Sequence, residues 1–191
     1  MNILIRRKKD DKIYFRPDTS LNRECSDIYV PEDISELYYS PIIFTIITKA
    51  GKYISPKFIS RYFDSFSFGI LLYEGEGIKN EDYACSSCLD KSSIISSKIF
   101  HEEDLKDKSF IIKSLDKDIY TYTSTDLKEL ESAICCGSIC TSLRIGDIVA
   151  LELERPKSLV VKNKVGNEDC DETRIETEFG GINDIDFKII F

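Results

Sequence analysis

Few residues in this 191-residue sequence combine a reactive side chain with a spacing that supports catalysis or metal binding. Cys85 and Cys88 have the C-x-x-C spacing of half a zinc site or of a redox pair. Cys135, Cys136 and Cys140 are the conceivable partners. Adjacent cysteines point to different sides of any regular element, and no second C-x-x-C or histidine cluster completes four ligands. We therefore expect reduced thiols in small buried side chains rather than a zinc site.

The single histidine removes most acid–base and triad chemistries. His101 is followed by Glu102, Glu103 and Asp104, and such crowded carboxylates favour a solvated turn over a buried triad base. The sequence contains no G-x-S-x-G, P-loop or G-x-G-x-x-G motif. It therefore lacks the backbone turns on which nucleophile-elbow hydrolases, P-loop nucleotide-binding proteins and dinucleotide-binding proteins depend.

Glu74 and Glu76 are alternate carboxylates that an extended segment would place on one face. Such a pair is a conceivable metal site. However, the two residues follow an apolar run and stand between Gly75 and Gly77, which is typical of a solvated turn. We keep them only as a weaker alternative for metal binding.

Charge and hydropathy limit the partners. The formal net charge is −8, and the only dense basic run is Arg6–Lys9, so we expect no nucleic-acid partner. We interpret residues 1–11 as a flexible basic N-terminus. The longest apolar stretch, Ile42–Ile47, is far shorter than the ~20 residues that cross a bilayer, and no basic-then-apolar leader is present. We expect a cytoplasmic protein without a membrane partner.

Short β-branched and aromatic runs predict a mainly β protein with a minor α component, in one domain over residues 1–191. The expected strands cover residues 12–16, 37–48, 65–73, 110–112, 119–123, 148–153, 159–162, 174–179 and 185–191. Two short helices are expected, one over 56–63 after Ser55, and one over 126–137 with Thr125 as its N-cap. Sheet-on-sheet packing or a rolled barrel fits this pattern.

Several of these segments resemble the C-terminal catalytic domain of the fumarylacetoacetate hydrolase family, over residues 12–191. The similar segments are Leu37–Phe44, Lys49–Ile54, Arg61–Asp64, Phe68–Ile70, Leu89–Asp90, Ser124–Asp147 and Glu176–Ile182. The resemblance implies a mixed β-sandwich roll and a homodimer. It also implies Mg²⁺- or Mn²⁺-dependent hydrolysis, decarboxylation or isomerisation of acylpyruvates and other small oxo-acids.

The resemblance places the family's three metal-binding carboxylates at positions that read Ser40, Ile42 and Leu71 in this chain. A hydroxyl and two hydrocarbon side chains cannot replace the hydration of a divalent cation. We therefore expect no cofactor at this place. Mg²⁺ or Mn²⁺ remains expected only if other residues restore the site.

The family's substrate-binding segments are also altered. Ser87 stands where the resemblance places a lysine, although Asp90 remains, and Lys52 is the nearest cation in the family register. The loop that grips substrate corresponds to Glu152–Pro156, where Arg155 and Pro156 are what is left of it. Asp90 and Lys52 are the only catalytic candidates, and both are weak.

Three hypotheses follow. The leading one is a non-catalytic protein with this family's fold and a binding or scaffold role. The alternative is an active hydrolase, decarboxylase or isomerase of oxo-acids with a rearranged site, using Asp90, Lys52, Glu74 or Glu76. The third ignores the resemblance and assigns a thiol or zinc function to Cys85 and Cys88.

Overall fold

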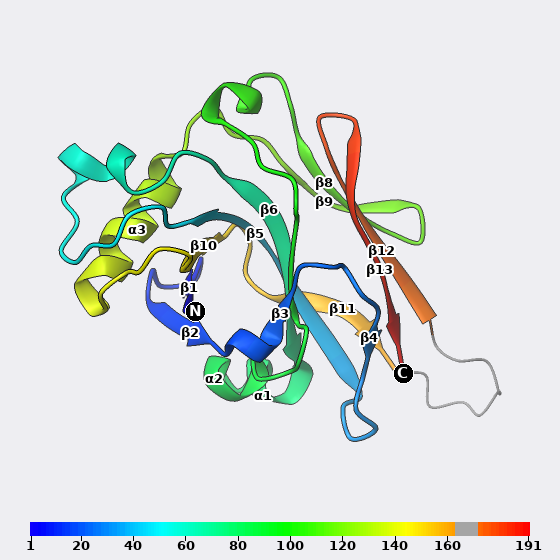
Figure 1. The fold of residues 1–191 in the computed structure, drawn as a ribbon. Helices are drawn as coiled ribbons and strands as arrows, with labels where there is room; N and C mark the ends of the chain where they lie inside the picture. The colour runs from blue at the N-terminus through cyan, green and yellow to red at the C-terminus, as the bar shows by residue number, and fades with distance from the viewer. Residues whose placement is uncertain (163–171) are drawn as a thin grey trace.

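The computed structural model describes residues 1–162 and 172–191, which form two packed β-sheets with short helices around them (Figure 1). The larger sheet has the strand order β2 (Ile13–Arg16), β1 (Ile3–Arg6), β10 (Ile148–Glu152), β5 (Glu36–Ile46), β6 (Ser67–Glu74), β7 (Ser93–Ile95) and β3 (Leu21–Asn22), with β11 (Lys157–Val161) also paired to β5. The smaller sheet has the order β4 (Ile28–Tyr29), β13 (Ile182–Ile190), β12 (Glu172–Phe179), β8 (Phe110–Ser114) and β9 (Lys117–Tyr122). This architecture confirms the expected mainly β class.

Helices cover the ends of the larger sheet. The α-helices are α1 (Gly75–Lys79), α2 (Tyr83–Ser86) and α3 (Lys128–Cys140), and the 3₁₀ helices are η1 (Asp18–Ser20), η2 (Pro56–Arg61) and η3 (Glu102–Leu105). Figure 1 shows α3 beside β1 and β10, and α1 with α2 below the centre of the sheet. Within the described residues, no helix is long and apolar enough to cross a bilayer.

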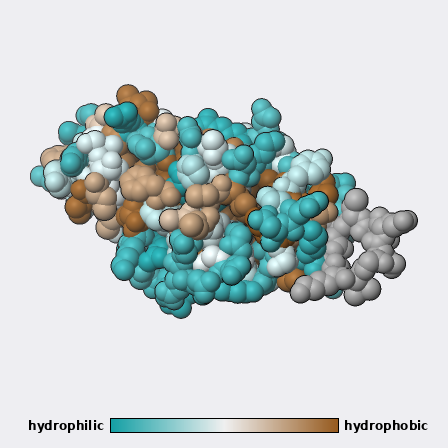
Figure 2. All heavy atoms as spheres, turned by 90° about the horizontal axis from the view of Figure 1, so that it is seen from below, coloured by the Kyte–Doolittle hydropathy of each residue, from teal (hydrophilic) through white to brown (hydrophobic). Residues whose placement is uncertain are grey.

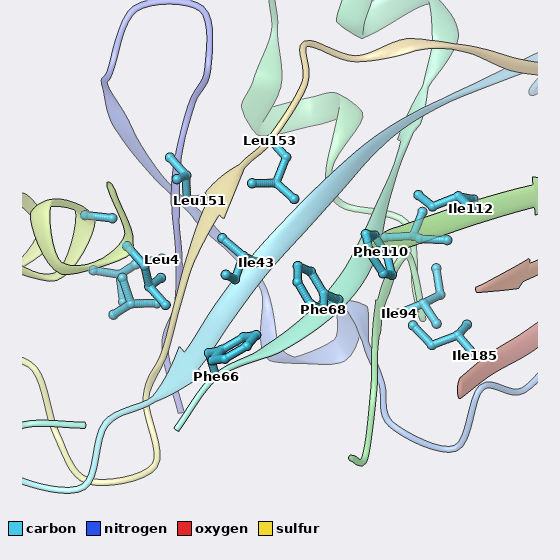
Figure 3. Packing of buried hydrophobic residues seen from close by; sticks show 14 of the residues in the cluster. Leu4, Ile43, Phe66, Phe68, Ile94, Phe110, Ile112, Leu151, Leu153 and Ile185 are labelled. Carbon is cyan, nitrogen blue, oxygen red and sulfur yellow. The ribbon is translucent and has the colours of Figure 1, made fainter. Parts of the chain in front are cut away.

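The main core lies between the two sheets and is built from aromatic and branched side chains (Figure 3). The Phe68 ring from β6 stacks on Phe110 from β8, with a centroid distance of 4.4 Å and an interplanar angle of 6°. Phe66 and Phe179 add edge contacts to this group. Strands β5 and β6 are buried on both faces, so nearly all of their residues are apolar. These continuous apolar runs are the reason that the sequence alone predicts both strands.

The N-terminus is the main correction to the sequence analysis. The flexible basic arm expected over residues 1–11 is wrong, because residues 3–6 form β1 between β10 and β2 in the larger sheet. Leu4 and Ile5 are fully buried. The sequence analysis missed this strand because it has only four residues, because basic residues follow it, and because its parallel partner β10 lies far along the chain.

The helices differ from the prediction in type and position. Residues 56–61 form the 3₁₀ helix η2 rather than an α-helix, and the helix expected over 126–137 is α3. Leu127, not Thr125, occupies the N-cap position of α3. The turn expected around Glu74 begins α1, so α1 and α2 were missed, as were the short strands β3, β4 and β7.

We predict that β1 is necessary for stability. The Leu4→Ala substitution should lower the free energy of unfolding by about 2–5 kcal/mol, because it removes a buried side chain that packs near Gly137 of α3. Urea titration followed by circular dichroism measures the change. The control Lys12→Ala, at a side chain that is 74% exposed, should stay within about 0.5 kcal/mol. Equal, small effects of both variants would contradict the assignment of β1.

Candidate functional site

A second core lies on the opposite face of the larger sheet, and this is the face that the family resemblance points to. It contains buried side chains from β1, β5, β6, β7 and β10, together with Ile78 of α1 and Tyr83 of α2. Because side chains alternate along a strand, Ser40, Ile42 and Phe44 of β5 all face this core. The helices α1 and α2 close it from outside.

The three positions expected for metal ligands do come together here. Ser40 lies directly opposite Leu71 in the pairing of β5 with β6, and Ile42 is two residues further along β5. Ser40 and Leu71 are fully buried, and Ile42 is 1% exposed. The Ser40 hydroxyl donates a 2.6 Å hydrogen bond to the backbone oxygen of Glu154.

These residues do not fit a divalent cation, which needs several oxygen ligands with negative charge. One hydroxyl already bound to the backbone and two hydrocarbon side chains offer almost none. Among residues 1–162 and 172–191, no group of three or more His, Cys, Asp and Glu side chains is arranged to hold a metal ion.

A buried chain of polar groups crosses the same face. Tyr73 of β6 donates a 2.6 Å hydrogen bond to Oε1 of Glu152, at the end of β10. The hydroxyls of Tyr14 and Tyr73 are also 2.6 Å apart. Since the Tyr73 proton points to Glu152, Tyr14 must be the donor to Tyr73. The backbone N–H of Lys8 donates to the other carboxylate oxygen at 3.0 Å.

Two arginines flank this chain. The Arg16 guanidinium lies 4.9 Å from the centroid of the Tyr73 ring and donates a 2.7 Å hydrogen bond to the Ser92 hydroxyl. Arg16 is only 3% exposed, and its Nη2 makes the hydrogen bonds to Ser92 and to the backbone oxygen of Leu72, whereas its Nε and Nη1 are buried without a hydrogen-bond partner among the described residues. Arg7 stacks on Tyr83 at 4.4 Å, and Tyr83 packs against both Tyr14 and Tyr73.

Burial dominates the electrostatics of the chain. Desolvation raises the pKa of Glu152, although the hydrogen bonds from Tyr73 and Lys8 and the charges of Arg16 and Arg7 oppose it. Desolvation and the nearby Glu152 raise the pKa of Tyr83 to about 12, and they also raise the pKa of Tyr73 and of Tyr14. The tyrosines therefore stay neutral. Glu152 is fully buried, so no substrate reaches its carboxylate in this conformation.

The acidic candidates Glu74 and Glu76 have separate surroundings. The Glu74 carboxylate caps α1 by accepting hydrogen bonds from the backbone N–H groups of Glu76 and Gly77, at 2.5 and 2.6 Å. Glu76 is exposed in the first turn of that helix. The two side chains do not lie together on one extended face, so the paired carboxylate site is absent from this part of the structure.

The catalytic candidates Asp90 and Lys52 are both exposed and lie on different parts of the molecule. Asp90 follows α2 and lines a hollow with Tyr29 and Cys88. Lys52 lies in the bend beyond the Gly51–Leu143 bridge, with its ammonium 5.3 Å from the Tyr53 ring. Neither residue lines the closed face around Ser40.

Arg155 and Pro156 do line a small hollow, of about 210 Å³, outside that closed face. Its other walls include Tyr38, Lys79 and Tyr83. The two lysines at its rim already pair with carboxylates, Lys79 with Glu36 and Lys9 with Glu81. The hollow is smaller than the 300–1,000 Å³ typical of ligand pockets.

The thiol hypothesis gains no geometric support within the described residues. Cys85 and Cys88 are exposed at and after α2, whereas the cysteines at 135, 136 and 140 lie on α3, and all five are free. Cys170 falls outside the described residues. His101 is exposed and precedes η3, where its Nδ1 lies 3.0 Å from the backbone oxygen of Asp64, so the predicted surface turn is confirmed.

The sequence analysis missed the polar chain of Tyr14, Arg16, Tyr73 and Glu152. One signal was available: Glu152 is the single charge within the apolar run over 148–153, and a charge that interrupts a buried strand needs partners. The identities of those partners depend on the alignment of β2, β6 and β10, which local sequence does not give.

We predict a specific pH dependence from Glu152. Because its folded pKa is raised above 4.5, the folded state binds the proton more tightly, and the contribution to stability falls as pH rises from about 4.5 through the raised pKa. Relative to Glu152→Gln, the wild type should lose about 1.4 kcal/mol for each unit of the shift. Urea titrations at pH 4 to 9 measure this difference. A difference between the wild type and Glu152→Gln that stays flat over this pH range would contradict the assignment.

Comparison with known proteins identifies the fold. No protein-family model matches the chain, and no curated protein matches it. Among solved structures, 5-carboxymethyl-2-hydroxymuconate delta-isomerase from Mycobacterium smegmatis has a TM-score of 0.81 at 13% identity, covering 99% of this chain and 78% of that one. A fumarylacetoacetate hydrolase family protein from Yersinia pestis has 0.74 at 15%, covering 99% and 92%.

Fumarylpyruvate hydrolase from Pseudomonas aeruginosa, solved with Mn²⁺ and pyruvate, has a TM-score of 0.73 at 10% identity, covering 100% of this chain and 90% of that one. The chain therefore has the fold of the fumarylacetoacetate hydrolase family, and the expected β-sandwich roll is confirmed. At sequence identities of 10% to 15%, these similarities show the fold alone.

Proposed function

We propose that this protein is a non-catalytic form of the fumarylacetoacetate hydrolase fold, with a binding or scaffold role and without a divalent cation. One observation carries the proposal. Ser40, Ile42 and Leu71 meet on the face where the fold's metal ligands are expected, and all three are buried in a closed apolar core.

The polar chain on that face supports a structural role. Glu152 lies where the substrate-gripping loop begins in the family register, and its carboxylate binds Tyr73 and the backbone of Lys8. The aromatic rings of Tyr14, Tyr73 and Tyr83 pack over the strands. These side chains fill the space above the sheet. We therefore expect an oxo-acid to have no bound cation to coordinate there and no cavity to enter.

The hollow beside Arg155 also argues against turnover. Its volume of about 210 Å³ and its lysines, which already pair with Glu36 and Glu81, leave little to attract a dicarboxylate.

We predict that titration calorimetry with MnCl₂ or MgCl₂ up to millimolar concentration shows no saturable binding. Under the same conditions, fumarylpyruvate and oxaloacetate should not be consumed above the uncatalysed rate. Fumarylpyruvate hydrolase from Pseudomonas aeruginosa, whose structure contains Mn²⁺, is the positive control.

Two results would contradict the proposal. Turnover that disappears with a chelator would show that other residues restore a metal site. Chelator-resistant turnover that is lost in Glu152→Gln would show metal-free acid–base chemistry by the buried carboxylate, the alternative that the raised pKa of Glu152 makes worth testing.

We also propose that the protein forms a homodimer through an apolar patch at the C-terminal end of α3. The patch consists of Tyr53, Phe58, Ile139 and Ile145, which are 69%, 42%, 60% and 73% exposed. The backbone N–H of Tyr53 donates to the oxygen of Ser138, which brings two of these segments together. Figure 2 shows brown and tan residues interspersed with teal and white ones over the left half of the molecule, the side on which α3 and the segment around residue 55 lie in Figure 1.

Light scattering after size exclusion should give twice the chain mass of 21.9 kDa. The double variant Ile139→Lys and Ile145→Lys should give the monomer mass, because charges in a buried interface are not solvated. The control Leu115→Lys, at a side chain that is 64% exposed in the β8–β9 turn, should remain a dimer. A wild-type monomer at 100 µM would overturn this assignment.

A further inference from the structure

A second hollow, of about 440 Å³, lies at the other end of the closed face, away from Arg155 and Glu152. We call it the β5–β7 slot. It lies between the end of β5, the turn that leads into β6 and the segment after β7, and its lining includes Phe44, Ile46, Phe66, Ile95 and Ile99. Its volume falls within the range of small-molecule pockets, and native cores contain few voids larger than one water molecule.

The floor of the slot is rigid and apolar. Phe44, Phe66 and Ile95 are 3%, 1% and 3% exposed, so each is anchored in a core while one side faces the slot. Ile46 is half-buried, and Ile99 is 63% exposed at the rim. An apolar ligand would therefore bury hydrocarbon on both walls without any rearrangement of the strands.

Four of the six hydroxyl groups that line the slot, those of Thr45, Ser65, Ser67 and Ser96, already have acceptors. Thr45 donates to the oxygen of Ser65 at 2.6 Å, and Ser67 donates to the oxygen of Lys98 at 2.6 Å. Ser96 is also bonded to the backbone around Lys98. With these protons engaged, only the hydroxyls of Thr48 and Ser97 in the lining have no acceptor among the described residues, which is too few donors for a sugar or another polyhydroxyl compound.

The charges at the rim favour an anionic head group. Arg23 and Lys98 line the slot together with a single carboxylate, Asp64. Within residues 1–162 and 172–191, neither cation lies within 4.0 Å of a carboxylate oxygen, and the nearest partners are the Met1 sulfur for Arg23 and the Asn183 backbone oxygen for Lys98. The lining thus carries two cations against one carboxylate, and the half-buried Asp184, which is not in the lining, is the further carboxylate that interacts with Lys98.

The largest hollow, of about 800 Å³, lacks this combination. Its lining is mixed and polar, and the charged residues there pair with neighbours: Lys8 with Glu129, Lys108 with Asp104, and Asp126 with Lys128. Asp107 is the charged lining residue without an ion pair among the described residues, so this surface presents no unpaired cation to orient an anionic ligand.

We propose that the β5–β7 slot binds a small apolar monocarboxylate, with the hydrocarbon part against Phe44, Phe66 and Ile95 and the carboxylate at Arg23 and Lys98. This site needs no metal and lies at the other end of the closed face from Ser40. It would give the protein a ligand-binding role that does not depend on the family's chemistry.

Ligand titrations with isoleucine-methyl-labelled protein test the proposal, using octanoate, octanol and octylammonium as matched probes. Octanoate should bind saturably, with a dissociation constant on the order of 0.1 mM for a ligand of this size. The methyl resonances of Ile46, Ile95 and Ile99 should shift, while that of Ile134, buried in α3, should not. Octanol and octylammonium should bind about tenfold more weakly, because octanol has no negative charge to pair with Arg23 and Lys98, and octylammonium is repelled by them.

Variants at the rim test the head group. Arg23→Gln and Lys98→Gln should each weaken octanoate binding by about fivefold to tenfold and leave octanol binding unchanged. Lys106→Gln, which removes the same charge at an exposed position outside the slot, is the control. The proposal is overturned by an absence of saturable binding, by shifts elsewhere in the molecule, by octanol or octylammonium binding as tightly as octanoate, or by rim variants that behave like the control.

Discussion

A buried divalent cation loses its hydration shell, and only oxygen ligands that carry negative charge can replace it. In the proposed function, that constraint is what distinguishes this chain from a metal-dependent enzyme with the same fold. Ser40, Ile42 and Leu71 stand together on β5 and β6, so the frame that would hold three ligands is intact. Their side chains supply one hydroxyl, already donated to the backbone, and hydrocarbon. A divalent cation placed there would lose its water ligands and would gain no charged oxygen ligands in their place.

The same face is closed by groups that stabilise one another. Glu152 is a charge in an apolar strand, and it is tolerated because Tyr73 and the backbone of Lys8 donate to it while Arg16 and Arg7 lie near. The desolvation that raises its pKa also makes the hydrogen bonds stronger than they would be in water. The hydrogen bonds of the polar chain thus join β2, β6 and the end of β10. In the proposed function, packed side chains occupy the space on this face of the sheet where a substrate would otherwise bind.

The sequence predicted the long strands well because their physics is local. The apolar runs that became β5, β6 and β10 mark strands buried on both faces, and the family resemblance aligned Ser40 with Leu71. It could not predict contacts that join distant segments, such as the bonds from Tyr73 to Glu152 and to Tyr14, which span 79 and 59 residues. Strand β1 was hidden for the same reason, because four residues followed by a basic run become a strand only beside β10.

The most direct test of the account is anomalous X-ray scattering from crystals soaked in millimolar MnCl₂. The account predicts no manganese peak between β5 and β6, with the Ser40 hydroxyl still bonded to the oxygen of Glu154. A peak within about 2.5 Å of oxygen atoms near Ser40 and Leu71, with acidic side chains turned towards it, would contradict it.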